Sequence, residues 1–120
     1  MVEPVTAAVR ALVGAALAAA LIAAAPQHRF NRLIVEGHAL AVHRCSRCHA
    51  VESRGRSPNP AAPPFRTLGR RYPIESLDEA LAEGIMVGHA NMPDTPWKPT
   101  EIERFIAYLK SINPVDGPRR

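Results

Sequence analysis

The sequence predicts an all-α domain of three or four short helices joined by long loops, and three observations favour this class. Apolar residues recur at helical spacing in three separate stretches, and none shows the alternation that is typical of a strand. The 120 residues include 12 prolines and 7 glycines, which argues against a regular bundle or a long coiled coil. Only 6 residues are aromatic, so side chains alone supply little bulk for the core.

The first 25 residues are interpreted as a targeting segment. Residues 11–25 are fifteen uncharged residues preceded by Arg10, which is the length of a secretory apolar region and less than the roughly 20 residues of a spanning helix. A signal peptide is favoured, and an uncleaved membrane anchor through residues 5–25 is the alternative. In both cases we expect the rest of the chain in the periplasm, as one domain over residues 26–115 and a short tail over 116–120.

The first helix is predicted between Phe30 and Val42. Its apolar positions share one face, on which Gly37 takes the place of a side chain; these positions are 30, 33, 34, 37, 40 and 41. From Val51 to Arg71 the periodicity disappears and four prolines occur, so we expect a loop that is ordered only by packing on something else.

Two further helices are predicted from their start and stop signals. One begins at the capping box Ser76-Leu77-Asp78-Glu79 and ends at Gly84 or Gly88. The other begins at a second box, Thr100-Glu101-Ile102-Glu103, carries an apolar stripe and ends at Asn113-Pro114.

Both cysteines of the chain lie in one pentapeptide, Cys45-Ser46-Arg47-Cys48-His49, where the first helix ends. This is the signature of c-type haem attachment. Thiols three residues apart on a helical turn can reach the two vinyl groups on one edge of the porphyrin, and His49 then lies under the iron. A disulfide or a redox dithiol is the alternative in an exported protein, but both leave His49 without a role. A zinc site would need a second ligand pair, which His38 and His43 are poorly spaced to supply.

On these residues the sequence resembles the class I c-type cytochromes, over about Leu33 to Ile112. The family has a glycine eight residues before the first cysteine, matched by Gly37, and an aromatic residue of the last helix that packs on it, matched by Tyr108. It also has a proline whose carbonyl accepts the ring N–H of the proximal histidine, and a methionine followed by proline. The resemblance implies a cytochrome c fold around one covalent haem c, with site residues Cys45, Cys48, His49, Pro63 and Met92.

The sixth iron ligand decides the function. The candidates downstream are Met86, His89, Met92 and Lys98. Met92 is favoured because Pro93 disfavours the α conformation before it and stiffens the loop. With His49 and Met92 on the iron, both axial positions are filled, and the protein is an electron carrier and not an enzyme. The alternatives are a cytochrome subunit of a dehydrogenase or oxidase complex and, with an open iron, a haem enzyme or gas sensor.

The charge pattern predicts how the protein meets its partners. The net charge of +4 is too low for a nucleic-acid binder. Between Arg44 and Arg71 the sequence has seven arginines and only one acidic residue, Glu52, whereas the next predicted helix is rich in acidic residues. We therefore expect a dipolar monomer that attracts redox partners with an acidic surface. One or two of Arg66, Arg70, Arg71 and Tyr72 are expected to pair with the haem propionates. Trp97 lies either over the haem edge or in ordinary packing.

Overall fold

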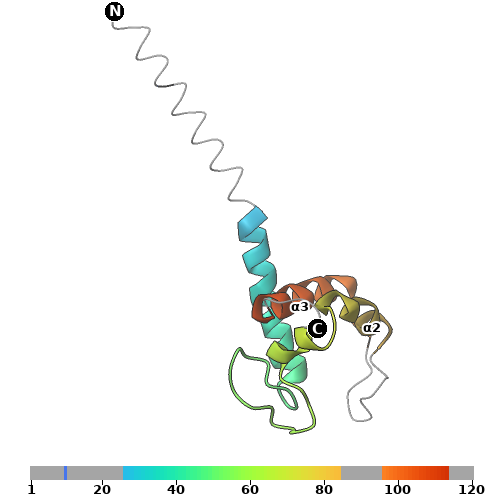
Figure 1. The fold of residues 1–120 in the computed structure, drawn as a ribbon. Helices are drawn as coiled ribbons and strands as arrows, with labels where there is room; N and C mark the ends of the chain where they lie inside the picture. Colours follow the sequence, from blue (N-terminus) through green and yellow to red (C-terminus); the bar gives the residue numbers. More distant parts are fainter. Residues whose placement is uncertain (1–9, 11–25, 85–95, 114–120) are drawn as a thin grey trace, which may run out of the picture. The chain divides into compact units, whose positions relative to one another are not determined.

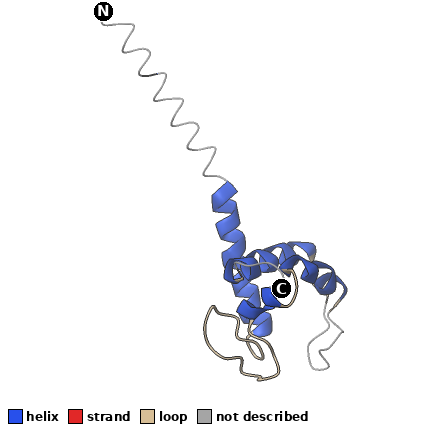
Figure 2. Ribbon diagram, viewed as in Figure 1, coloured by secondary structure: helices blue, strands red, loops and turns tan. Residues whose placement is uncertain are grey.

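A computed structural model of the chain describes residue 10, residues 26–84 and residues 96–113, and the regular structure in these segments is entirely helical (Figure 2). The chain forms two compact units, Met1–Asn31 and Arg32–Arg120. In the first unit, residues 26–30 are helical and exposed, and the Gln27 side-chain amide donates a hydrogen bond of 3.1 Å to Asn31. Within the described segments, no helix has both the length and the apolar character required to cross a membrane.

In the second unit, residues 32–45 form a helix, called here the attachment helix, which crosses helix α3 (Pro99–Ile112) (Figure 1). Its buried residues are Gly37, Ala41 and Cys45, spaced by four as on one face of a helix. The prediction that Phe30 shares this buried face is wrong, since its side chain is 45% exposed. The helical period identifies the correct face for Gly37 and Ala41, which belong to the stretch that crosses α3, whereas Phe30 belongs to the first unit.

The segment between the attachment helix and residue 64 is a loop whose backbone is hydrogen-bonded to its own first residues. The loop was predicted to extend to Arg71, but Phe65–Arg70 form a 3₁₀ helix, because 3₁₀ turns need only short-range hydrogen bonds such as the one from the Arg71 N–H to the Leu68 carbonyl. The Asn59 N–H donates to the Cys48 carbonyl over 3.1 Å, and the Phe65 N–H donates to the Ala50 carbonyl over 3.0 Å. The hydroxyl of Ser57 accepts a hydrogen bond of 3.0 Å from the Ala50 N–H. The loop therefore closes around the Cys-X-X-Cys-His turn.

Three short elements follow this loop: the 3₁₀ helices η1 (Phe65–Arg70) and η2 (Ile74–Ser76), and helix α2 (Leu77–Glu83), which packs against α3. Helix α2 ends at Gly84, as predicted, with a φ of 89° that favours glycine. The predicted capping box is not formed. Ser76 belongs to η2 and has helical φ and ψ angles of −64° and −12°, so its side chain makes no capping hydrogen bond.

Helix α3 begins two residues earlier than predicted. Pro99 occupies its first turn, where the missing N–H is not needed and the restricted φ suits a helix. Lys98 is therefore the N-cap residue, and Glu101 rather than Glu103 accepts a hydrogen bond of 3.0 Å from the Lys98 N–H. The helix ends at Asn113, as expected.

Asn113 is the one polar residue that is buried within the described segments. Its side-chain oxygen accepts from the Gly69 N–H over 3.0 Å, and its amide nitrogen donates to the carbonyls of Phe65 and Leu109, both over 2.9 Å. These bonds attach η1 to the end of α3, so a single side chain holds in place the segment that follows the proline-rich loop.

Candidate cofactor site

The Cys-X-X-Cys-His turn continues the attachment helix by one turn. The backbone N–H groups of Cys48 and His49 both donate to the carbonyl of Cys45, over 3.1 and 2.9 Å. Cys45 is buried, Cys48 is exposed, and both are free thiols. Burial raises the pKa of the Cys45 thiol to about 11, although the neighbouring Arg44 charge opposes the shift. Cys45 is thus a neutral thiol at pH 7 in an apolar setting, which suits a residue that meets an apolar ring edge.

His49 is half-buried, and its ring is fixed by two neighbours. Nδ1 lies 2.8 Å from the carbonyl oxygen of Pro63. A carbonyl can only accept, so Nδ1 carries the proton and Nε2 of the neutral ring keeps its lone pair. The ring of Phe65 packs on the imidazole at a centroid distance of 5.0 Å. The hydrogen bond expected between His49 and Pro63 is therefore present, and it leaves Nε2 with the chemistry of a metal ligand.

Three aromatic side chains pack in sequence from His49: Phe65, Phe105 and Trp97. Phe65 meets Phe105 edge to face at 5.6 Å, and Phe105 meets Trp97 at 4.8 Å. The guanidinium of Arg44 lies 4.6 Å from the centroid of the Trp97 ring. The backbone N–H of Trp97 donates to the Leu81 carbonyl over 3.0 Å. The sequence left two positions open for Trp97, over the haem edge or in ordinary packing. In the structure its ring packs against Phe105 and Arg44.

Arg66 differs from the other arginines between residues 44 and 71. It is half-buried, whereas the other six are exposed. Its Nη1 atom is buried and has no hydrogen-bond partner among the described residues. A guanidinium is always charged, and an unpartnered charge away from water costs free energy. This orphaned atom fits a cofactor that brings a buried carboxylate, as haem does.

Gly37 lies where the attachment helix crosses α3. An ideal Cβ on Gly37 would overlap the carbonyl oxygen of Arg104 and would lie 2.6 Å from its carbonyl carbon and 2.8 Å from Cβ of Tyr108. The crossing expected between Gly37 and Tyr108 is present. The obstacle to a larger residue is the backbone of α3, however, and not the tyrosine ring.

A comparison with known protein families matches residues 34–113 to the family Cytochrome c. The chain belongs to the cytochrome c family. No curated protein and no solved structure matches it. Cytochrome c domains bind haem c covalently through two cysteines, and the chain has two, Cys45 and Cys48, at the required spacing. The all-α cytochrome c fold and the covalent haem c are thereby confirmed, and the chain is a haem-binding electron carrier.

Three of the four candidates for the sixth iron ligand lie outside the described residues: Met92, which is the expected ligand, Met86 and His89. Lys98, the remaining candidate, is exposed at the N-cap of α3.

Sequence reasoning missed a cluster that joins the haem-attachment segment to α3. Nε2 of His38 lies 2.6 Å from Glu52, and the His38 ring packs against the ring of Tyr108 at a centroid distance of 5.0 Å. The Tyr108 hydroxyl donates to the Val51 carbonyl over 2.6 Å. Its phenol has a pKa raised to about 12, mainly by burial and secondarily by the charge of Glu52. No local pattern reports these contacts, because they join residues 14 and 57 positions apart.

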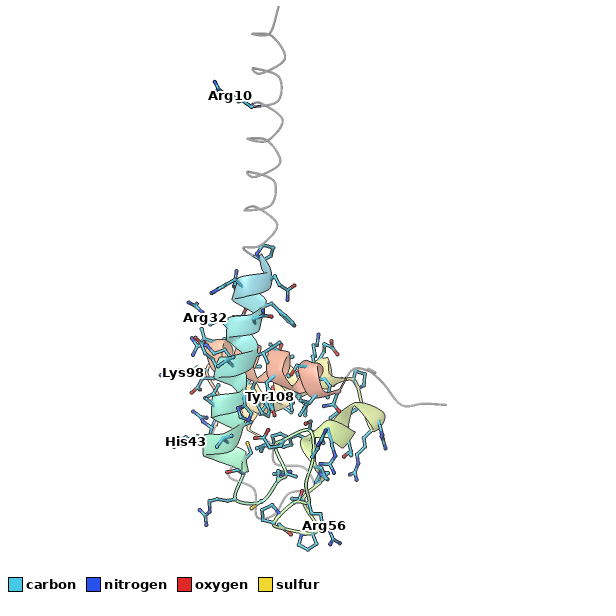
Figure 3. All side chains as sticks on the ribbon, turned by 90° about the vertical axis from the view of Figure 1, so that its left-hand side faces the viewer. Arg10, Arg32, His43, Arg56, Lys98 and Tyr108 are labelled. Carbon is cyan, nitrogen blue, oxygen red and sulfur yellow. The ribbon has the colours of Figure 1, made fainter. Side chains whose placement is uncertain are left out.

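The remaining histidines of the described residues are exposed. His28 belongs to the first unit, and His43 lies on the attachment helix (Figure 3). The exposed arginines include Arg56, which lies on the loop at the end remote from the helices (Figure 3).

Proposed function

We propose that the chain is a periplasmic one-electron carrier whose haem iron is bound by His49 and Met92. The observation that supports this most directly is the hydrogen bond of 2.8 Å from His49 Nδ1 to the Pro63 carbonyl, next to the two cysteines. It orients the imidazole and gives it the tautomer that ligates through Nε2. Haem c, when bound, supplies one-electron redox chemistry at its iron.

The residues around His49 favour electron transfer with little rearrangement. The Pro63 carbonyl accepts a hydrogen bond from Nδ1–H of His49, which makes the imidazole a stronger electron-pair donor through Nε2. Phe65, at 5.0 Å, restricts rotation of the ring, and its own backbone is held by Ala50 and Asn113. A ligand that keeps its orientation in both oxidation states lowers the reorganisation that accompanies electron transfer.

Met92 is proposed as the second axial ligand on the strength of its sequence context. Pro93 restricts its backbone, which reduces the entropy lost when the loop delivers its side chain to the metal. A thioether is a soft ligand that favours ferrous iron and raises the reduction potential. With both axial positions occupied, no position remains for a substrate or gas.

The proposed location and partners follow from charge and hydropathy. The fifteen uncharged residues at 11–25 are typical of export. Arg47, which precedes the exposed Cys48 in the sequence, is exposed, and so are Arg54 and Arg56 of the loop that follows. A basic surface next to the attachment site would steer an acidic redox partner, and its effect on the association rate would decrease with salt.

The decisive experiment is the visible spectrum of the purified holoprotein and of two methionine variants. Met92→Ala should abolish the sulfur-to-ferric charge-transfer band, lower the reduction potential and open the iron to carbon monoxide. Met86→Ala is the matched control and should leave the spectrum unchanged. If Met86→Ala abolishes the band and Met92→Ala keeps it, the ligand assignment is wrong and the carrier function stands. If the wild-type protein binds carbon monoxide readily, the carrier proposal itself is overturned.

A further inference from the structure

We infer that Asn113 is a positioning residue for the iron ligand His49. Its side chain fixes the segment at residues 63–65, and this segment sets the orientation and the donor strength of the imidazole. The inference rests on ligation of the iron by His49, which belongs to the proposed function, and it does not depend on Met92.

The segment at residues 63–65 contacts the imidazole at two points. The Pro63 carbonyl accepts the hydrogen bond of 2.8 Å from Nδ1–H of His49, and the Phe65 ring packs on the imidazole at a centroid distance of 5.0 Å. The carbonyl determines the basicity of the imidazole, and the phenyl ring limits its rotation. A displacement of these three residues would therefore change the ligand itself.

Asn113 holds this segment at its last residue. Asn113 and Phe65 are both 4% exposed, and Nδ2 of Asn113 donates to the Phe65 carbonyl over 2.9 Å. The side-chain oxygen of Asn113 accepts a hydrogen bond of 3.0 Å from the Gly69 N–H. One amide is thus bonded to both the beginning of η1 and a residue near its end.

Helix α3 gives Phe65 a fixed point outside the haem-attachment turn. The N–H of Phe65 donates to the carbonyl of Ala50, but Ala50 follows His49 directly and moves with it. Asn113 holds the other side of Phe65 from α3, and Phe105 of the same helix meets the Phe65 ring edge to face at 5.6 Å. The orientation of the imidazole is therefore set relative to α3.

The bonds of Asn113 to η1 are not required to end its own helix. Nδ2 also donates to the Leu109 carbonyl over 2.9 Å, but the backbone N–H of Asn113 already donates to this carbonyl over 3.0 Å. A neutral amide suits the site because it donates and accepts at once, whereas a hydroxyl has a single proton and a carboxylate has none.

The expected effect on the haem follows from the donor strength of the imidazole. A strong hydrogen bond from Nδ1–H makes the ring more basic, which stabilises ferric iron relative to ferrous iron and lowers the reduction potential. Without the Asn113 side chain, residues 63–65 are free to shift and this bond is weakened. The midpoint potential should then rise, and the imidazole plane should turn. The spread of the haem methyl resonances in the proton NMR spectrum of the ferric protein reports that plane.

The test compares Asn113→Ala with Gly37→Ala in the purified holoprotein. Both variants should lose stability, but the nearest neighbours of a Cβ at Gly37 are Arg104 and Tyr108. Asn113→Ala should raise the midpoint potential and change the spread of the haem methyl resonances, whereas Gly37→Ala should leave both close to the wild type. Unchanged values in Asn113→Ala would overturn the inference. Equal changes in the two variants would overturn it as well, because lost stability alone would then explain them.

Asn113→Asp covers the case in which the alanine variant does not hold its haem. A protonated carboxyl has the shape of the amide, and it can accept from Gly69 and donate to Phe65, whereas a carboxylate cannot donate. The haem methyl pattern should therefore differ from the wild type at about pH 9 and return toward it at about pH 5, because a buried carboxyl ionises at a higher pH than an exposed one. The wild type is measured at each pH as the control. A pattern in the variant that does not respond to pH contradicts the inference.

The wild-type spectrum separates a failure of this inference from a failure of the proposed ligation. If the ferric wild type lacks the resonances of an iron-bound imidazole, ligation by His49 is wrong and the inference falls with it. If these resonances are present and the Asn113 variants keep the wild-type pattern, His49 remains the ligand and only the positioning role of Asn113 is overturned.

Discussion

The hydroxyl of Tyr108 donates a hydrogen bond of 2.6 Å to the carbonyl of Val51, two residues after His49. Through this bond the last helix holds the backbone that leaves the haem-attachment turn. Tyr108 is buried, and the same residue lies at the crossing with Gly37, so one side chain serves both the helix packing and the position of the turn.

Tyr108→Phe should destabilise the holoprotein by about 1–3 kcal/mol, because it leaves the Val51 carbonyl without its donor in a buried place. Urea denaturation followed by circular dichroism measures the change. Tyr72→Phe is the control, since Tyr72 is only half-buried, and its effect should be smaller. Equal effects of the two substitutions would show that the hydrogen bond contributes nothing specific.

The difference in stability between the wild type and Tyr108→Phe should change in alkaline solution. The pKa of Tyr108 is raised from 10.0 to about 12, mainly by burial, so the unfolded chain loses this proton before the folded one does. The stability linked to this phenol is present below pH 10 and is lost as the pH rises through about 12. The advantage of the wild type over Tyr108→Phe should therefore shrink across this window in denaturation curves. A constant difference would contradict the shift.

Gly37→Ala should lower the melting temperature, with a cost of about 1–3 kcal/mol or more, because the added Cβ would overlap the Arg104 carbonyl and force the two helices apart. Ala39→Gly, on the exposed side of the same helix, tests the loss of helix propensity alone and should cost only about 1 kcal/mol. An unchanged melting curve for Gly37→Ala would mean that the helices do not cross there.

Asn113→Ala should destabilise the domain by about 2–4 kcal/mol, since it orphans the Gly69 N–H and the Phe65 carbonyl together. Asn113→Asp keeps the acceptor for Gly69 but buries a charge, so its stability should recover partly as the pH is lowered and the carboxyl is protonated. Ser111→Ala, near the same helix end, is the control. An Asp variant as stable as the wild type at pH 7 would show that the site is open to water.

Glu101→Gln should change the acid sensitivity of the protein. The pKa of Glu101 is lowered from 4.5, chiefly by its hydrogen bond from the Lys98 N–H, with the Arg44 charge contributing as well. The stability that this carboxylate supplies is present above pH 4.5 and is lost as the pH falls below it. Wild type and variant should therefore differ at pH 7 and converge in acid, as measured by urea denaturation at several pH values. A difference in stability that stays constant with pH would contradict the lowered pKa of Glu101.

The sequence alone determined the features that depend on neighbours along the chain. Periodicity predicts three helices because residues three and four apart share a face, and the cysteine spacing identifies the haem-attachment turn for the same reason. Two helix starts were predicted wrongly. The box at Thr100 was misplaced because Pro99 can occupy a first turn without losing a hydrogen bond, and Ser76 makes no cap because a 3₁₀ turn continues through it.

Only the tertiary structure decided which side chains meet across the loops. Nothing near Asn113 in the sequence shows that it bonds to Gly69, 44 residues away, nor does anything near His38 point to Glu52. The sequence does not distinguish among the seven arginines between residues 44 and 71. In the structure Arg66 has a buried nitrogen without a partner among the described residues, whereas the other six arginines are exposed. Burial and hydrogen bonding are properties of the folded chain, because they depend on what other segments cover, and local residue patterns carry no record of those segments.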